Sequence, residues 1–248
     1  MKGADMKTRI AVLLPLLALL AGFAGYASAG YEDLFKETKS AAWAVYTRST
    51  GGMNASCSAT AIKSDAKKTH LLTAGHCFLG VDFARTDFLV TQDHFTFYPA
   101  RVFKSGLKIK AGMQETSTDL DNYSGDDWAI VESDVGDKPV LPLGDSSALV
   151  VGEDLIVVGV PFGMDFLAVQ GIVGSLDLKL SSLVWNHYYG ANIFVAGGNS
   201  GSGVISVKQK AVVGIVDAGP GPQSSMMIFM PVSKLPKDLW DEPKAKGK

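Results

Sequence analysis

The chain has 248 residues, of which 47% are hydrophobic and 19% are charged, and its formal net charge is −2. This apolar fraction is typical of a packed globular protein and is too high for a disordered one. Because 23 basic side chains are balanced by 25 acidic ones, the charge gives no reason to expect nucleic acid or an anionic membrane surface as a partner. The sequence also lacks a repeat with a period of roughly 20 to 50 residues, which excludes repeat architectures.

The first 29 residues have the layout of a secretory signal peptide. Three basic residues among the first nine precede an uncharged apolar run over residues 10–24, and Ala27-Ser28-Ala29 places small residues at both positions that a signal peptidase reads. A retained membrane anchor is the alternative, since residues 10–29 carry no charge and just reach spanning length. Pro15 and the small-residue end favour cleavage. We therefore expect a secreted or periplasmic protein, with no stable membrane association once residues 1–29 are removed.

The chain contains two cysteines, Cys57 and Cys77. In an oxidising compartment an even pair predicts one disulfide. Closing a loop of this size would stabilise the fold by about 3 kcal/mol on the chain-entropy model. No C-x-x-C motif occurs and the histidines show no ligand spacing, so we expect neither a metal nor a cofactor. The four histidines are residues 70, 76, 94 and 187.

Apolar phrases after residue 30 are short and often β-branched, and clusters of Gly, Asp, Ser, Asn or Pro separate them at intervals near ten residues. This spacing is typical of an all-β barrel or sandwich. Turn residues over 136–142 divide the strands into two halves, so we predict an N-terminal barrel within 30–138 and a C-terminal barrel within 139–248. Helix is expected over 31–39 and, as a short C-terminal helix, over 233–240. The phrases that predict strands lie at residues 41–46, 88–90, 128–131, 155–158, 193–195, 211–216 and 226–230.

The phrase Leu72-Thr-Ala-Gly-His-Cys77 sets a histidine in a context suited to catalysis. A catalytic His needs a tightly held backbone and small neighbours, and Ala74 and Gly75 leave room for other segments to approach. A disulfide at Cys77 would fix the next residue. A lone His is more often structural, but this context favours His76 as a catalytic residue.

A carboxylate pair opens the apolar phrase Asp126-Asp-Trp-Ala-Ile-Val131. Successive side chains of an extended chain point to opposite faces, so only one of the two can turn inward. We choose Asp127, directly before the apolar run, to accept from an imidazole nitrogen, fix its tautomer and stabilise the imidazolium. The alternatives are that both carboxylates cap a surface turn, or that Asp119 or Asp121 takes this role.

The phrase Gly197-Gly-Asn-Ser-Gly-Ser-Gly203 sets Ser200 between glycines. A Ser on such a tight turn can expose its hydroxyl, while the backbone N–H groups of Gly198 and Ser200 point into one cavity. Such paired donors form an oxyanion hole, and losing one donor typically costs about 10² to 10³ in rate. Alone, a Gly/Ser loop is by default a linker. The combination with the His and Asp phrases predicts a nucleophile.

In the order His76, Asp127, Ser200, these phrases resemble the trypsin-like (chymotrypsin-fold) serine proteases. The resemblance covers nearly all of residues 40–236. It implies two perpendicular six-stranded antiparallel β-barrels with the active site between them, and a protein or peptide as substrate. It also implies that Ser200 attacks the scissile carbonyl, His76 moves the proton and Asp127 orients His76. Further phrases similar to the protease domain of the HtrA/Deg group lie at residues 143–146, 151–152, 159–163, 171–173 and 230–233.

The sequence departs from these relatives in three respects. HtrA proteins usually append PDZ domains, whereas this chain ends about a dozen residues after the protease-like region, so no peptide-sensing module is expected. Asn199 precedes the nucleophile, where digestive relatives have an Asp that pairs with a freed N-terminus, so activation by that ion pair is not expected. Asp217 stands where relatives tend to have a small hydroxyl or amide residue. Close to Asp127, its carboxylate would raise one of the two pKa values by like-charge repulsion; pointing to solvent and binding the substrate backbone are the alternatives.

The resemblance also locates a primary specificity pocket. Six residues before the nucleophile, where trypsin carries an Asp, this chain has Phe194. An apolar pocket follows, and we predict cleavage after small or medium aliphatic side chains. The predicted substrate-binding residues are Phe194, Val216, Asp217, Ala218 and Gly219.

The predicted function is an exported serine endopeptidase that acts through an acyl-enzyme. A catalytically inactive binding protein with the same fold is the alternative, and Asp217 together with a Met-rich pocket speaks for it. An esterase-like hydrolase is disfavoured, because the nucleophile lacks the G-x-S-x-G elbow and the triad order differs.

Overall fold

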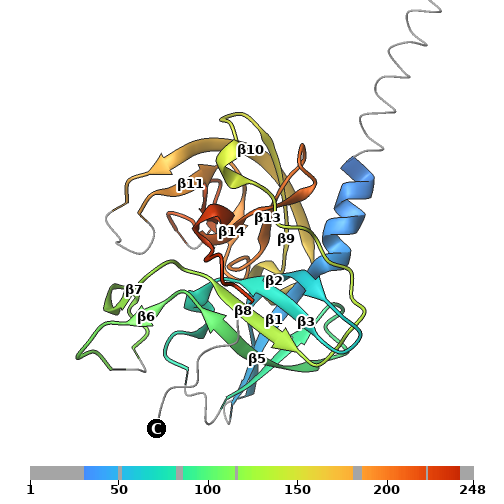
Figure 1. Ribbon diagram of the computed structural model, residues 1–248, viewed down its shortest axis with the longest axis vertical. Coiled ribbons are helices and arrows are strands. Elements are labelled where there is room, and N and C mark those ends of the chain that lie inside the picture. The colour runs from blue at the N-terminus through green and yellow to red at the C-terminus, as the bar shows by residue number, and fades with distance from the viewer. Residues whose placement is uncertain are drawn as a thin grey trace, which may run out of the picture.

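The computed structural model of the chain describes residues 31–49, 52–81, 86–114, 117–180, 186–221 and 223–240. It contains two closed six-stranded barrels, one above the other in Figure 1. The predicted all-β double barrel is therefore confirmed. The predicted signal peptide lies outside the described residues. Within those residues, no helix combines the length and the apolar character that crossing a membrane requires.

The first barrel closes in the order β1-β2-β3-β8-β5-β4, and all its neighbouring strands are antiparallel. A separate short hairpin pairs β6 (Lys108–Ile109) with β7 (Tyr123–Ser124). The barrel strands are β1 (Ala42–Ser49), β2 (Gly52–Ser64), β3 (Thr69–Thr73), β4 (Asp87–Thr91), β5 (Tyr98–Ser105) and β8 (Ala129–Ser133).

The second barrel closes in the order β10-β11-β16-β14-β13-β9 and is antiparallel as well. Two short strands, β12 (Val195–Ala196) and β15 (Gln223–Ser224), pair outside it. The turn-rich stretch 136–142 lies in the connection between the barrels, after β8 and before β9. The barrel strands are β9 (Asp154–Gly159), β10 (Leu167–Leu178), β11 (Tyr188–Ala191), β13 (Gly203–Ser206), β14 (Ala211–Ala218) and β16 (Met227–Pro231).

Buried apolar side chains hold the two barrels together. Trp43 of β1, Ile156 of β9 and Met230 of β16 are each fully buried in the same core cluster. A second cluster, around Leu155 and Phe229, fills the interior of the second barrel. Burying one such aliphatic or aromatic side chain stabilises a fold by about 1.5–3 kcal/mol. The barrels therefore form one packed unit in which loops of both can meet.

A helix over residues 31–41 lies beside the barrels, where the sequence predicted helix over 31–39 (Figure 1). Leu34 is buried in the larger core cluster, and the Thr38 hydroxyl donates to the Leu34 carbonyl oxygen at 2.7 Å. The Tyr31 hydroxyl donates to Asp154 Oδ2 at 2.9 Å, at the start of β9. The helix is therefore bonded to the second barrel before the chain enters the first.

The predicted short C-terminal helix is not formed. The described part of this segment consists of the 3₁₀ turn η5 (Val232–Lys234) and further turns up to residue 240. Pro236 explains the difference, because it has no N–H to donate and drives the residue before it out of the helical region. Leu235 accordingly has an extended backbone, with φ −66° and ψ 141°.

Instead of a helix, the last described residues pack against the first barrel. The Trp240 ring lies with its centroid 5.5 Å from that of His70, in an edge-to-face arrangement. Lys63 Nζ lies 4.6 Å from the Trp240 ring centroid. Lys104 Nζ donates to the Asp238 carbonyl oxygen at 2.6 Å. The chain thus returns to its first half after completing the second barrel.

Candidate active site

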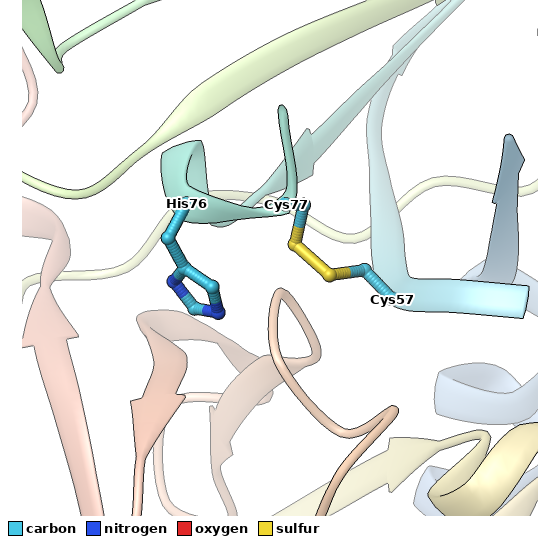
Figure 2. Close-up of side chains that lie close together, drawn as sticks. All are labelled: Cys57, His76 and Cys77. Carbon is cyan, nitrogen blue, oxygen red and sulfur yellow. A yellow bond between two sulfur atoms is a disulfide. The ribbon is translucent and has the colours of Figure 1, made fainter. Parts of the chain in front are cut away.

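His76 lies on the 3₁₀ turn η1 (Gly75–Phe78), directly after β3. A Cβ added at Gly75 would lie only 3.0 Å from the Trp128 carbonyl oxygen, so the turn packs closely on the segment that enters β8. The next residue, Cys77, is disulfide-bonded to Cys57 of β2, which confirms the predicted pairing. Figure 2 shows the His76 ring leaving the same turn that carries the disulfide. The backbone on both sides of His76 is therefore fixed.

Two hydrogen bonds join His76 to Asp127. The His76 main-chain N–H donates to Asp127 Oδ1 at 2.7 Å, and His76 Nδ1 lies 2.7 Å from Asp127 Oδ2. Burial alone would lower the pKa of His76, but the Asp127 charge and hydrogen bond outweigh it and raise that pKa. An ionised Asp127 accepts from an Nδ1–H, which leaves the proton off Nε2. The pair therefore holds the imidazole ring in one orientation and one tautomer.

Asp127 and Asp126 point in opposite directions, as the alternation of an extended chain predicts. Asp127 is fully buried, and its main-chain N–H donates to the Tyr188 hydroxyl oxygen at 2.8 Å. Asp126 instead lies at the surface and accepts from Lys234 Nζ at 3.0 Å. The other rival carboxylates belong to the turn η2 (Leu120–Asn122), where Asp119 accepts from the main-chain N–H of residue 121. The structure thus brings Asp127, and not these rivals, to His76.

The loop that carries Ser200 lies against the strand that leads to His76. Gly201 has φ +86°, and a Cβ there would clash with Thr73 Oγ1 and with the Ser58 carbonyl oxygen. The Ser58 main-chain N–H donates to the Ser200 carbonyl oxygen at 2.8 Å. Since residue 58 follows the disulfide-bonded Cys57, the same covalent link fixes the supports of both His76 and Ser200.

Two peptide groups before Ser200 are held in a fixed orientation. The Gly197 carbonyl oxygen accepts from the Phe162 N–H at 2.6 Å, and the Gly198 carbonyl oxygen accepts from Ser58 Oγ at 2.8 Å. In a trans peptide the N–H points opposite to the C=O, so the Gly198 N–H points away from Phe162. Within the described residues, the N–H groups of Gly198 and Ser200 donate to no protein acceptor. Both predicted oxyanion donors are therefore available.

A cavity of about 290 Å³ opens beside Ser200. Predicted pocket residues Val216, Asp217, Ala218 and Gly219 line it, whereas Phe194 does not: its side chain is 41% exposed and does not belong to the lining. β12 begins directly after Phe194 and contributes the next two residues to the wall instead. The complete lining is Phe162, Val195, Ala196, Gly197, Ser200, Val216, Asp217, Ala218, Gly219 and Gly221.

Phe162 is a lining residue that the sequence did not predict. It lies on the 3₁₀ turn η4 (Pro161–Gly163), has φ +56° and is 54% exposed. A positive φ at a bulky side chain is strained and is typical of functional loops. The Pro-Phe-Gly turn was visible in the sequence, but its approach to the Ser200 loop depends on how β9 and β10 pair.

Two groups of side chains are close enough to hold a metal ion among the described residues. The first contains Cys57 and Cys77, whose thiols are consumed by the disulfide. The second contains His76, Asp127 and Asp217, with ligand atoms within 4.8 Å of one another. His76 and Asp127 already bond each other through Nδ1, the main-chain N–H and both carboxylate oxygens.

Sequence comparison matches residues 57–215 to the family described as the trypsin-like peptidase domain. A "Probable periplasmic serine endoprotease DegP-like" of Hahella chejuensis (strain KCTC 2396) is 26% identical over 132 residues, covering 53% of this chain and 27% of the relative. A protein of the same name from Pseudomonas putida (strain ATCC 700007 / DSM 6899 / JCM 31910 / BCRC 17059 / LMG 24140 / F1) is 34% identical over 89 residues, covering 36% of this chain and 18% of the relative. The chain thus spans about a quarter or less of the length of these relatives.

Solved structures show the same fold. "HtrA-type protease AlgW with tripeptide" has a TM-score of 0.63 at 18% identity, covering 82% of this chain and 60% of the other. "Crystal structure of Deg5" has a TM-score of 0.61 at 17% identity, covering 84% and 90%. The family match includes the segments that carry His76, Asp127 and Ser200, and the double barrel agrees with it. The chain therefore belongs to the trypsin-like peptidase domain family.

Proposed function

We propose that this protein is an exported serine endopeptidase that hydrolyses peptide bonds through the triad His76, Asp127 and Ser200. The observation that carries the proposal is the double hydrogen bond between His76 and Asp127, beside a loop that presents Ser200 next to two unoccupied N–H donors. The proposal retains a two-domain division at 30–138 and 139–248, with residues 1–29 removed on export.

In the first half of the reaction, Ser200 Oγ attacks the carbonyl carbon of the scissile bond and its proton passes to His76 Nε2. The carbonyl oxygen becomes an oxyanion, which accepts from the Gly198 and Ser200 N–H groups. His76 then gives the proton to the leaving amine, and the C–N bond breaks to leave an ester on Ser200. Asp127 stabilises the imidazolium throughout and keeps its carboxylate form.

In the second half, a water molecule loses a proton to His76 Nε2 and attacks the ester carbon. The oxyanion forms again at the same donors, and the proton returns to Ser200 Oγ as the C–O bond breaks. The products are the free acid and the regenerated enzyme. No cofactor or metal takes part in this sequence of steps.

The cavity beside Ser200 supports a preference at the residue before the cleaved bond. Its walls include Val195, Ala196 and Val216, and Gly219 leaves space between them. An apolar cavity of this kind favours small or medium aliphatic side chains. The same cavity supports a protein or peptide as the substrate. The similar AlgW protease has been solved with a tripeptide. The signal-peptide layout supports a secreted or periplasmic location, as do the names of the curated relatives.

The experiment is labelling with an aryl phosphonate probe that reacts with activated serines. The protein with Ser200 should be labelled, and Ser200→Ala should not. Trypsin serves as the positive control, and Ser202→Ala is the matched control because it removes a hydroxyl from the same loop that is fully buried. A protein that stays unlabelled while trypsin reacts would favour the second candidate, a catalytically inactive binding protein. The observation that favours that candidate is the buried carboxyl group of Asp217 close to Asp127.

A further inference from the structure

We propose that Asp217 holds a proton and donates it, as an O–H hydrogen bond, to the carboxylate of Asp127. Asp217 is then a positioning residue that acts through Asp127, and the inference rests on the proposed function. This proton stays in the hydrogen bond between the two carboxyl groups and is not transferred during the proposed hydrolysis. The buried pair carries one negative charge in place of two.

A β-bulge directs the Asp217 side chain. In the pairing of β14 with β16, Val216 lies opposite Phe229 and Ala218 lies opposite Ile228, which leaves Asp217 as the extra residue. Such a bulge breaks the alternation of a strand and turns one side chain to a new direction. Asp217 is only 3% exposed, and its carboxylate lies within 4.8 Å of ligand atoms of both His76 and Asp127.

The Asp217 carboxyl group has no hydrogen-bond partner of normal geometry in the described part of the chain. A buried carboxylate in this condition is very unfavourable, whereas a carboxylic acid can donate through its own O–H. Each oxygen of Asp127 accepts one hydrogen bond from His76, and a carboxylate oxygen can accept more than one hydrogen bond. Asp127 can therefore accept the Asp217 proton without losing His76.

The charges that face Asp217 agree with a neutral acid. Burial raises its pKa well above the ordinary value, and the negative charges of Asp127 and Asp126 raise it further, while the Met230 main-chain N–H acts in the opposite direction. Tyr188 faces the same space with its hydroxyl, and burial raises the pKa of that hydroxyl, so Tyr188 is neutral and adds no charge. Lys234 is the neighbouring cation, but its ammonium bonds Asp126 at 3.0 Å.

The neutral acid has a consequence for His76. A second negative charge beside the imidazole would stabilise the imidazolium and raise the pKa of His76 further. His76 would then be protonated over a wider pH range and unavailable as a base. With Asp217 neutral, the site retains a single carboxylate opposite the imidazole while the added O–H bond fixes the orientation of Asp127.

The test uses the full chain with Ser200→Ala, so that no turnover is needed. The pKa of His76 is measured by NMR titration of its ring in this protein and after the further change Asp217→Asn, which is neutral at every pH. We expect the two His76 pKa values to agree within about 0.3 unit, since no charge is lost. The matched control is Asp126→Asn, whose carboxylate is bonded to Lys234. A decrease of about 1 to 3 units on Asp217→Asn, the size expected for removing a close negative charge, would overturn the proposal.

Infrared spectroscopy of the Ser200→Ala chain with isotope-labelled aspartate gives a second readout that needs no change at position 217. We expect the C=O band of a protonated aspartic acid at neutral pH, lost in Asp217→Asn and retained in Asp126→Asn. Absence of that band from the unsubstituted Asp217 chain would overturn the proposal even where Asp217→Asn fails to fold. Addition of Zn²⁺ tests the remaining alternative, in which a cation and not a proton lies between the two carboxyl groups. Tight binding of Zn²⁺ that requires Asp217 and abolishes the band would favour this alternative and overturn the proposal. None of these readouts depends on catalysis. A protein that the phosphonate probe fails to label would therefore refute the proposed function without deciding the protonation of Asp217.

Discussion

The main-chain N–H of Ser58, in the first barrel, donates a 2.8 Å hydrogen bond to the carbonyl oxygen of Ser200, in the second. The Ser58 hydroxyl also donates to the Gly198 carbonyl oxygen at 2.8 Å and accepts from the Val160 N–H at 3.0 Å. One residue of the first barrel thus holds the loop that carries the proposed nucleophile. Its neighbour Cys57 links this support to the turn that carries His76.

Asp127→Asn should reduce kcat by about 10⁴ while the protein stays folded, because an amide no longer fixes the Nδ1–H tautomer of His76. The measurement is kcat and KM on one peptide substrate selected from a library, with circular dichroism to check folding. Asp126→Asn is the control, since it removes only a partly exposed pair with Lys234 worth about 0 to 1 kcal/mol. A large loss in the control with near-normal activity of Asp127→Asn would show that the wrong carboxylate had been chosen.

The pH dependence of kcat/KM should follow His76. The base must be neutral, and Asp127 raises the pKa of His76 in the folded protein. Activity should therefore fall as pH decreases through a value above the ordinary 6.5. For stability the sign is opposite: the His76–Asp127 pair stabilises the fold fully below the unfolded pKa of His76, and this part is lost as pH rises through the raised one. An acid limb at or below 6.5 would contradict the shift.

Replacing both cysteines by serine (Cys57→Ser with Cys77→Ser) should lower the melting temperature. The chain-entropy model gives about 3 kcal/mol for a loop of this length, which corresponds to roughly 6 to 12 °C for a chain of this size. Differential scanning calorimetry measures the shift, and the reduced native protein should behave in the same way. An unchanged melting curve would mean that the disulfide does not form.

Gly201→Ala should disrupt the site more than the same change at a glycine with similar backbone. Gly201 (φ +86°) and Gly112 (φ +83°) both adopt a left-handed conformation, but an added Cβ meets Thr73 Oγ1 and the Ser58 carbonyl oxygen only at the former, while nothing lies within 4 Å at the latter. Both changes cost about 1 to 2 kcal/mol of backbone strain, and Gly201→Ala adds about 1 to 3 kcal/mol of overpacking. Urea unfolding and phosphonate labelling measure the two effects. Equal destabilisation of both variants would refute the close packing of the Ser200 loop.

Local patterns in the sequence predicted much of the structure. Strand alternation was enough to separate Asp127 from Asp126, because the choice between them depends on neighbouring residues alone. The predicted C-terminal helix is wrong, although the reason is local as well: Pro236 lies within the segment and Leu235 before it has an extended backbone. The fold class followed from the spacing of the strands and from the resemblance to a known family.

The direction of individual side chains around the cavity was beyond the sequence. The bulge at Asp217 depends on the register between β14 and β16, which no local pattern specifies. Phe162 reaches the cavity because its turn bonds Gly197, 35 positions further along the chain. Phe194 was expected in the pocket from its spacing to Ser200, but the chain turns its side chain outward before β12 begins. Each of these depends on pairings between distant segments.

The return of residues 232–240 to the first barrel has a consequence for synthesis. A ribosome completes the first barrel's strands long before it delivers Trp240, whose indole packs on His70. During synthesis the N-terminal half therefore lacks this cover until Trp240 has been added to the chain.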